Sequence, residues 1–202
     1  MKKILLATHN RDKAREFQML LAGLDIEVLT LDAFPQVGEL VEDGESLDEN
    51  ALRKARETWR ITGLPALADD TGLEVFYLNK APGVYSARFA GPGATYASNC
   101  RKLLAELRGV PPRRRNAQFR CVLALVGWST EVILAEGVCT GTITESPRGT
   151  NGFGYDPLFL PSGCTHTYAE MEDESKNRIS HRGKAAREMK ALIAKSGILT
   201  KS

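Results

Sequence analysis

The chain has 202 residues, of which 43% are hydrophobic, and this length favours one domain over residues 1–202 with a sizeable buried core. Its 27 basic and 25 acidic side chains leave a net charge of +2, which argues against nucleic-acid or membrane partners. No apolar stretch could span a bilayer, and the run at residues 4–7 is too short for a signal peptide. Four cysteines without a C-x-x-C pair are typical of reduced thiols. We therefore expect a cytoplasmic protein.

The first part of the chain predicts alternating strands and helices. The unbroken apolar run at residues 4–7 predicts a strand buried on both faces. Asn10 is a good N-cap for a helix, and residues 26–31 predict a second strand. A capping-box sequence begins at Ser46 and indicates a helix that runs towards Thr62.

The middle of the chain predicts two short strands and a helix. Residues 65–68 and 73–78 are the strands, and D-D-T-G at residues 69–72 is good turn chemistry between them. Glycines and prolines indicate a loop at residues 82–93. A helix is predicted over residues 95–108.

The last part of the chain predicts neighbouring strands and a final helix. Two apolar segments, residues 117–128 and 131–144, predict antiparallel strands joined by a short turn. A glycine-rich loop at residues 146–156 leads to a short strand at residues 158–160, and the last helix begins near Ser180. Alternating strands and helices followed by adjacent strands predict a mixed α/β sheet.

Polar and basic residues follow the first predicted strand, in T-H-N-R-D-K at residues 8–13. A strand that leads directly into a helix N-terminus presents free N–H groups and a favourable dipole to an anion. Arg11 and Lys13 add positive charge in the first helical turn. The alternative is an ordinary helix cap with solvated basic side chains, and the absence of G-K-[ST] excludes a P-loop.

Asp69 and Asp70 are adjacent carboxylates beside a buried strand. Such a pair is costly to bury unless it is paired or metal-bound, and hard oxygen ligands suit Mg²⁺ together with substrate phosphates. The acidic run at residues 42–49 could supply another carboxylate to the same metal. The alternatives are an Asx turn for the aspartates and a solvated loop with a helix start for the acidic run.

Two later segments could bind a nucleotide. In N-G-F-G-Y-D-P (residues 151–157), glycines flank Phe153, so the backbone can approach a flat ligand while the ring stacks on it. The alternative is a loop with core aromatics. In S-K-N-R-I-S-H-R (residues 175–182), His181 and Arg182 open a helix, and their donors could bind a carbonyl group or a phosphate. The alternative for this pair is simple exposure to solvent.

Other chemistries lack their usual signals. The three histidines do not have metal-ligand spacing, which argues against a zinc site, and no segment matches a nucleophile elbow. Residues 113–115 are consecutive arginines, and Phe119 is close to them in the sequence. They suggest RNA binding, but one short basic run without a basic face is most simply a solvated loop.

Taken together, the motifs carry a specific resemblance. The chain contains T-H-N-R-D-K at residue 8, V-E-D-G at 41, E-N-A-L-R-K-A at 49, A-D-D-T-G-L-E-V at 68, P-G-V-Y-S-A-R-F at 82, G-F-G-Y-D-P-L-F at 152 and K-N-R-I-S-H-R-G at 176. In this order they resemble the inosine triphosphatase family, also called dITP/XTP pyrophosphatases. The resemblance spans nearly the whole chain, and F-G-Y-D-P and S-H-R are highly specific in this order.

This resemblance implies a fold and an activity. The implied fold is α/β, a long twisted mixed β-sheet with flanking helices and two lobes around a central substrate cleft, in a homodimer. The implied activity is Mg²⁺-dependent hydrolysis of aberrant purine nucleoside triphosphates, such as ITP, dITP and XTP. The products would be the nucleoside monophosphate and pyrophosphate, and the reaction would cleanse the nucleotide pool.

The resemblance also implies roles for individual residues. Asp69 would be the catalytic carboxylate, with Lys13 and Lys54 neutralising charge on the phosphates. Mg²⁺ would be held by Asp69 and Glu42. Phe153 would stack on the base. Substrate binding is implied for Thr8, His9, Asn10, Arg11, Asp12, Lys13, Lys54, Asp70, Phe153, Gly154, Tyr155, Asp156, Lys176, His181 and Arg182.

Selectivity would come from the end of the motif series. Lys176, His181 and Arg182 would close the nucleotide pocket and read the 6-keto group of inosine or xanthosine. Adenine presents an amino group at that position, so a donor in the protein would face another donor. A site built on such hydrogen bonds can discriminate by ~10⁴ or more, because a mismatch leaves buried polar groups unpaired.

Two positions depart from the family pattern. His9 stands where a small residue is common. Leu47 stands where an aromatic residue is usual, which leaves Glu45 as an alternative to Glu42 as metal ligand. Two other functions also stay open: a pyrophosphatase for modified pyrimidine triphosphates, and a non-catalytic nucleotide-binding or RNA-binding module.

Overall fold

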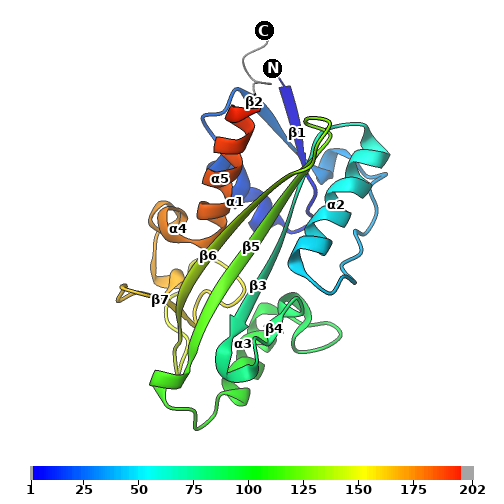
Figure 1. Cartoon of the computed structure of the whole chain (residues 1–202). Helices are drawn as coiled ribbons and strands as arrows, with labels where there is room; N and C mark the ends of the chain where they lie inside the picture. The colour runs from blue at the N-terminus through cyan, green and yellow to red at the C-terminus, as the bar shows by residue number, and fades with distance from the viewer. Residues whose placement is uncertain (1, 197–202) are drawn as a thin grey trace. The chain divides into compact units, whose positions relative to one another are not determined.

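A computed structural model describes residues 2–196 as a seven-stranded sheet with helices beside it (Figure 1). The strands are β1 (Lys2–Leu6), β2 (Ile26–Thr30), β3 (Ala66–Val75), β4 (Pro82–Gly83), β5 (Asn116–Val126), β6 (Ile133–Ile143) and β7 (Phe159–Pro161). The α-helices are α1 (Arg11–Leu21), α2 (Leu47–Thr62), α3 (Tyr96–Glu106), α4 (Asp173–Ile179) and α5 (His181–Lys195). Short 3-10 helices are η1 (Leu31–Ala33), η2 (Phe76–Leu78), η3 (Ser86–Arg88), η4 (Pro112–Arg114) and η5 (Tyr168–Glu170).

The sheet mixes parallel and antiparallel pairs, as predicted. Its order is β2-β1-β3-β5-β6-β7, with β4 paired to β3 beside this path. β1 pairs in parallel with both β2 and β3, whereas β4 pairs antiparallel with β3 and β7 antiparallel with β6. The α/β fold with a mixed sheet and flanking helices is therefore confirmed.

The described chain divides into two compact units. Unit 1 comprises residues 2–70, 121–137 and 182–196, and unit 2 comprises residues 71–120 and 138–181. The boundaries fall inside β3, β5 and β6, so each of these long strands contributes to both units. A single domain for the whole chain stays a prediction.

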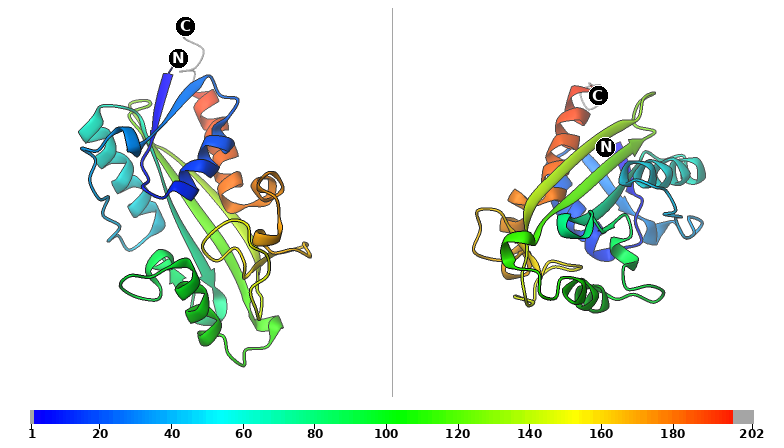
Figure 2. Two further views of the ribbon diagram at one scale, coloured as in Figure 1. Left: turned by 180° about the vertical axis from the view of Figure 1, so that it is seen from behind. Right: turned by 60° about the horizontal axis from the view of Figure 1, so that its bottom comes forward.

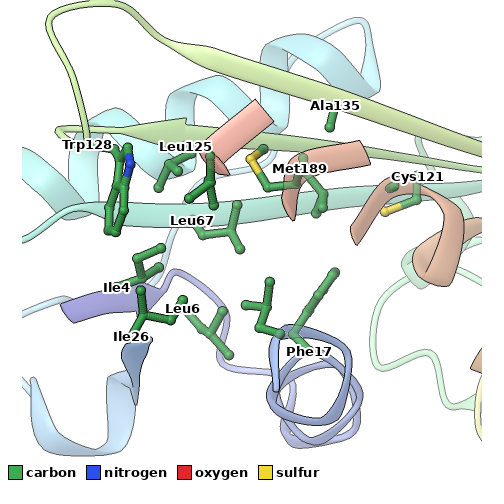
Figure 3. Close-up of a cluster of buried hydrophobic side chains, with 14 residues drawn as sticks. Ile4, Leu6, Phe17, Ile26, Leu67, Cys121, Leu125, Trp128, Ala135 and Met189 are labelled. Carbon is green, nitrogen blue, oxygen red and sulfur yellow. The ribbon is translucent and has the colours of Figure 1, made fainter. Parts of the chain in front are cut away.

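Helices cover both faces of the strands in unit 1. Phe17 of α1 and Met189 of α5 pack with Ile4 and Leu6 of β1 and with Leu67 of β3 (Figure 3). α2 lies along the opposite face of these strands and buries its two alanines there (Figure 1). Burying a large apolar side chain contributes roughly 1.5–3 kcal/mol, so this cluster fixes α1 and α5 on β1 and β3.

The ends of α2 follow from its sequence. Ser46 Oγ accepts a hydrogen bond from the Glu49 N–H at 3.2 Å, as the capping-box sequence predicts. The Glu49 carboxylate accepts from the N–H of Glu45 at 3.1 Å, one residue before the expected partner. Gly63 follows the helix in the left-handed conformation, with φ of 68°, which glycine adopts without a steric penalty.

Unit 2 has its own core, built around aromatic rings. The ring centroid of Phe119 of β5 lies 4.8 Å from that of Phe159 and 5.9 Å from that of Tyr168. Leu103 of α3 is fully buried in the same cluster. α3 begins with a complete capping box at Thr95 and packs against η3 (green in Figure 2). The predicted helix at this position is confirmed.

The predicted turn at D-D-T-G is wrong. Residues 69–72 lie inside β3, which runs without interruption from Ala66 to Val75. Gly72 serves a different purpose, because a Cβ there would lie 2.7 Å from the carbonyl oxygen of Gly83 in β4. The glycine thus permits β3 and β4 to pair closely. This pairing, rather than the turn that the sequence pattern predicted, determines the structure of these residues.

The four cysteines are free thiols, which confirms the sequence expectation. Cys100, Cys121 and Cys139 are buried and Cys164 is partly exposed. In the part of the chain that the structure describes, no helix is long and apolar enough to cross a membrane.

Candidate active site

The T-H-N-R-D-K segment connects β1 to α1 in unit 1. Asn10 caps α1 as predicted, because its Oδ1 accepts from the N–H groups of Asp12 and Lys13 at 3.0 and 3.2 Å. The N–H of Asn10 in turn donates to Thr8 Oγ1 at 3.2 Å. Arg11 and Asp12 are exposed. The cap thus occupies two of the N–H groups at this end of α1, which an anion could otherwise bind. Since Arg11 is exposed, Lys13 is the cationic side chain that the segment brings into the protein.

His9, which departs from the family pattern, is exposed but has a defined contact. Its Nε2 lies 2.9 Å from the carbonyl oxygen of Gly38. This contact connects the T-H-N-R-D-K segment to the loop that leads to Glu42. The histidine, which is larger than the residue common in the family, is therefore accommodated here without disturbing α1.

Lys13, which is partly buried, forms an ion pair with the buried Asp69. Lys13 Nζ lies 2.9 Å from Asp69 Oδ2. Burial by itself raises the pKa of the Asp69 carboxyl, but the positive charges of Lys13, Lys54 and Arg182 outweigh it and lower the pKa to about 2. Burial likewise lowers the pKa of Lys13, and the carboxylates around it, Asp69 foremost, raise it by more. Both groups are therefore charged at neutral pH.

Asp69 and Asp70 project from opposite faces of β3, because successive side chains of a strand alternate. Asp69 reaches Lys13 of α1, whereas Asp70 Oδ2 accepts a hydrogen bond from Asn50 Nδ2 of α2 at 2.9 Å. Burial raises the pKa of Asp70, and the charges of Lys54 and Lys13 offset this only in part. The two adjacent carboxylates thus have different environments and are not a single bidentate pair.

Lys54 connects β3 to the acidic loop, by which we mean residues 42–46, the part of the acidic run that precedes α2. Its Nζ donates to the backbone carbonyl of Asp69 at 2.6 Å and also contacts the carboxylate of Glu42. Lys54 is buried, and Glu42 is partly buried. Glu45, the alternative to Glu42, is exposed and its N–H is bound by Glu49. The structure therefore brings Glu42, rather than Glu45, to the residues around Asp69.

Arg182, at the start of α5, approaches the same carboxylate. Its Nη1 lies 2.6 Å from Glu16 Oε2, and its Nε lies 4.0 Å from Asp69 Oδ2. Burial lowers the pKa of Arg182, but the charges of Glu16 and Asp69 outweigh burial and raise it. The expectation that a lone arginine at a helix start is exposed is wrong here, because Glu16 supplies a buried partner from α1.

We call these groups the Asp69 cluster. It comprises the cations Lys13, Lys54 and Arg182 and the carboxylates Glu16, Glu42, Asp69 and Asp70. Carboxylates exceed cations by one, so a triphosphate would need further positive charge to bind here. Across residues 2–196, no group of three or more His, Cys, Asp or Glu side chains is arranged to hold a metal. Mg²⁺ usually takes one or two carboxylates and completes its shell with phosphate oxygens and water, so this set of hard oxygen donors fits it.

In unit 2, Asp156 organises the G-F-G-Y-D-P segment. Its Oδ2 accepts from the N–H of Phe153 at 2.9 Å and lies 2.6 Å from Lys176 Nζ of α4. A side chain at Gly152 would collide with the Asp156 carboxylate, and Gly152 has a φ of 71°. The glycine, the aspartate and the lysine therefore fix one tight turn, which presents Phe153.

Phe153 is partly exposed and has neighbours on two elements. Its ring centroid lies 5.8 Å from that of Tyr96 at the start of α3, and Lys176 Nζ lies 5.0 Å from the Phe153 centroid. The alternative of a fully buried core aromatic is therefore wrong for Phe153. It is right for Tyr155, which is buried in the unit 2 core.

The remaining residues of this turn are bound to the body of unit 2. Tyr155 Oη donates to the carbonyl oxygen of Ser86 at 2.8 Å, and burial raises the Tyr155 pKa. The Cys100 thiol donates to the carbonyl oxygen of Gly154 at 3.3 Å, and burial, together with the charge of Asp156, raises the Cys100 pKa to about 11. These neutral hydrogen bonds hold the segment in place.

His181 is buried in unit 2, where the sequence suggested an exposed side chain. Its ring stacks on Phe119, with centroids 4.5 Å apart and an interplanar angle of 14°. Tyr168 lies beside it at 6.1 Å. His181 and Arg182 are consecutive, yet the boundary between the units falls between them. Their side chains therefore belong to different clusters.

Three buried residues were not recognised from the sequence. Glu16 and Asn50 are buried partners of site residues, and the only signal for Asn50 was its spacing of four from Lys54. Arg115 is not part of a solvated loop, because its guanidinium is buried and donates to three backbone carbonyls. With Arg115 and Phe119 both buried, the RNA-binding interpretation loses two of its four side chains.

Comparison with known proteins shows the family of the chain. The model of the Ham1 family matches residues 4–192 of the chain. The chain belongs to the Ham1 family. Every candidate site residue, from Thr8 to Arg182, lies within the range shared with the Ham1 family.

Named proteins of three bacteria are similar to the chain. A protein of Desulfotalea psychrophila named dITP/XTP pyrophosphatase is 51% identical over 188 residues, which cover 93% of this chain and 83% of that protein. One of the same name from Geobacter sulfurreducens is 47% identical over 98% of this chain and 100% of that protein. The structure of a HAM1 protein from Coxiella burnetii has a TM-score of 0.87 and 42% identity over 96% of this chain and 100% of that one.

Proposed function

We propose that the protein hydrolyses aberrant purine nucleoside triphosphates, such as ITP, dITP and XTP, to the monophosphate and pyrophosphate. The observation that carries this proposal is Asp69, a buried carboxylate held between Lys13 and Arg182 in a chain whose relatives are named dITP/XTP pyrophosphatases. Such an arrangement suits a polyanionic substrate that brings its own metal ion.

In this proposal the Asp69 cluster binds the triphosphate. Lys13 and Lys54 donate to phosphate oxygens and neutralise the charge that builds up on them. Asp69 accepts a hydrogen bond from a water and orients its oxygen towards the α-phosphorus. The bond from the water oxygen to the α-phosphorus forms as the bond from that phosphorus to the bridging oxygen breaks. The bridging oxygen leaves as part of pyrophosphate, and Asp69 takes the proton that the water loses and passes it to solvent. Positioning and charge neutralisation supply most of the acceleration.

We propose Mg²⁺ as the cofactor, held by Asp69 and Glu42. When bound, it would neutralise phosphate charge and polarise the reacting phosphoryl group. Lys54 supports this assignment, because it contacts both the Glu42 carboxylate and the Asp69 carbonyl and so keeps the two residues together.

The base would be recognised by the G-F-G-Y-D-P segment together with three basic side chains. Phe153 would stack on the purine, with Gly154, Tyr155 and Asp156 as its support. Lys176, His181 and Arg182 would supply donors that accept a 6-keto purine and reject the amino group of adenine. The Arg182→Ala variant should lose part of the preference for ITP over ATP, and an unchanged ratio of kcat/KM for the two substrates would contradict this role.

Three further properties are proposed with the activity: the homodimer comes from the family resemblance, whereas the single domain and the cytoplasmic location come from the length and composition of the chain. We propose that the chain acts as a single domain, that it forms a homodimer, and that it is located in the cytoplasm. Analytical ultracentrifugation of the purified protein tests the dimer directly, because a monomer has half the expected mass.

Pyrophosphate release from ITP, XTP, GTP and ATP, with Mg²⁺ or with EDTA, tests the proposal. We expect fast release from ITP and XTP in the presence of Mg²⁺ only. Absence of release from all four nucleotides would refute the proposed function. Adding modified pyrimidine triphosphates to the panel tests the rival enzyme activity, for which no contact described above provides support.

A further inference from the structure

Asn50 lies on α2 with its side chain fully buried, and the assignments above give it no part in the site. Its Oδ1 accepts a hydrogen bond from the N–H of Gly44 at 2.8 Å, and its Nδ2 donates to Asp70 Oδ2 at 2.9 Å. These partners fix the orientation of the amide. A reversed amide would place its NH2 group against an N–H and its oxygen against a carboxylate.

Lys54, one helical turn after Asn50, makes a parallel connection. Asn50 joins the acidic loop to β3 through Gly44 and Asp70, and Lys54 joins them through Glu42 and Asp69. Residues four apart share one face of a helix, so the two connections lie side by side. The acidic loop is thus held to β3 at two adjacent points.

The connection through Asn50 is closely packed. A Cβ at Gly44 would lie 2.7 Å from Asn50 Oδ1 and 3.1 Å from the Glu49 carboxylate. Gly44 comes two residues after Glu42, so any shift of its N–H also moves the Glu42 backbone. The asparagine therefore connects Asp70 to the backbone two residues after Glu42.

We propose that Asn50 is a positioning residue, which sets the place of the Glu42 carboxylate for binding of the divalent cation. This inference rests on the proposed function for its choice of cation and substrate. Asn50 itself touches neither the cation nor the reacting atoms. It acts through Gly44 and Asp70, as residues behind metal ligands do elsewhere.

Two variants of Asn50 test the proposal. Asn50→Ala removes both hydrogen bonds, and Asn50→Leu removes them while it keeps a branched side chain of the same number of heavy atoms. We expect the Mg²⁺ concentration for half-maximal ITP hydrolysis to rise about 10- to 100-fold, as for other residues that orient metal ligands. The dissociation constant of Mn²⁺, measured by electron paramagnetic resonance without nucleotide, should rise in parallel, while kcat at saturating Mg²⁺ changes less.

Asn99 provides a matched control in unit 2. It occupies the corresponding position of α3, is buried, and its Oδ1 accepts from the N–H of Ala90 at 2.8 Å. Asn99→Ala should lower the Tm as Asn50→Ala does, but leave the Mn²⁺ dissociation constant unchanged. Equal Mn²⁺ constants in wild type and in the folded Asn50 variants would overturn the proposal.

Gly44→Ala keeps the proposal testable if both Asn50 variants fail to fold. Its methyl group pushes against Asn50 Oδ1, so the Mn²⁺ constant should rise, and an unchanged constant would overturn the proposal. Where the Asn50→Ala protein folds, adding Gly44→Ala should weaken Mn²⁺ binding no further. A wild type that binds Mn²⁺ but does not hydrolyse ITP would refute the proposed function alone, since the Mn²⁺ comparison still decides the role of Asn50.

Discussion

Asp69 in unit 1 and Asp156 in unit 2 are both buried aspartates that contact a lysine, yet their surroundings differ. Asp156 Oδ2 lies 2.6 Å from Lys176 Nζ and also accepts a hydrogen bond from the N–H of Phe153. Asp69 has Lys13 at 2.9 Å, and the charges of Lys54 and Arg182 also act on it. Asp156 and Lys176 thus form an ion pair of one negative and one positive charge, whereas Asp69 belongs to a cluster of seven charges.

From this difference we propose that Asp156 serves structure and that Asp69 serves binding. An ion pair with a backbone donor fixes a turn. A cluster of several cations and carboxylates keeps charges available for a ligand that brings both anionic oxygens and a cation. The two aspartates should therefore respond differently to the same substitution.

Asp69→Asn should have the largest effect on catalysis. We expect kcat for ITP to fall by about 10³-fold, because the variant loses the charge that holds the cation and orients the water. The fold should survive, since the amide oxygen can still accept from Lys13. Steady-state pyrophosphate release measures the loss and circular dichroism checks the fold. Activity within a few-fold of wild type would contradict the role of Asp69.

Asp156→Asn should instead act mainly on stability. It leaves Lys176 as a buried charge without its carboxylate, which costs about 3–5 kcal/mol when one partner of a buried pair is removed. Urea denaturation should show this as a lower midpoint with an unchanged slope. KM for ITP should rise because the turn that presents Phe153 loosens. If the variant lost kcat but kept its stability, the contrast between the two aspartates would be wrong.

Local patterns predicted the parts of the fold that depend on near neighbours. Asn10 and Ser46 cap their helices as expected, because each cap bonds to an N–H two or three residues away. The turn at residues 69–72 was wrong because the strand there is maintained by pairing with distant segments. A pattern within four residues cannot include the partner that decides between a turn and a strand.

The burial of site residues was hidden for the same reason. Arg182 is buried because Glu16, 166 residues earlier, neutralises it. His181 is buried because Phe119 of β5 offers a ring to stack on. The sequence motifs identified the residues of the candidate site. Only the fold shows which of these residues lie next to each other and which neighbours allow them to be buried.

Phe153→Ala should have a smaller effect, confined to substrate binding. Loss of a stacking ring costs about 1–3 kcal/mol per base in proteins that stack bases, so KM for ITP should rise by roughly 5- to 150-fold with little change in stability. Phe76→Ala is the control, because Phe76 is an exposed phenylalanine of unit 2 that lies outside the candidate site. Equal KM values for the two variants would mean that Phe153 does not contact the base.

Cys100 gives the smallest predicted effect, on thiol chemistry in unit 2. Because its pKa is raised to about 11 from 9.0, the thiol stays protonated at pH 8 and should react with iodoacetamide far more slowly than the partly exposed Cys164. The unfolded chain ionises first, so this thiol's contribution to stability is present below pH 9 and is lost as the pH rises towards 11. Mass spectrometry of the labelled native protein measures the two rates, and urea denaturation between pH 8 and 10 should show a shallower decline for Cys100→Ala. Equal labelling of Cys100 and Cys164 would mean that the Gly154 segment opens readily, and the turn that presents Phe153 would then be less rigid than the Asp156 contacts indicate.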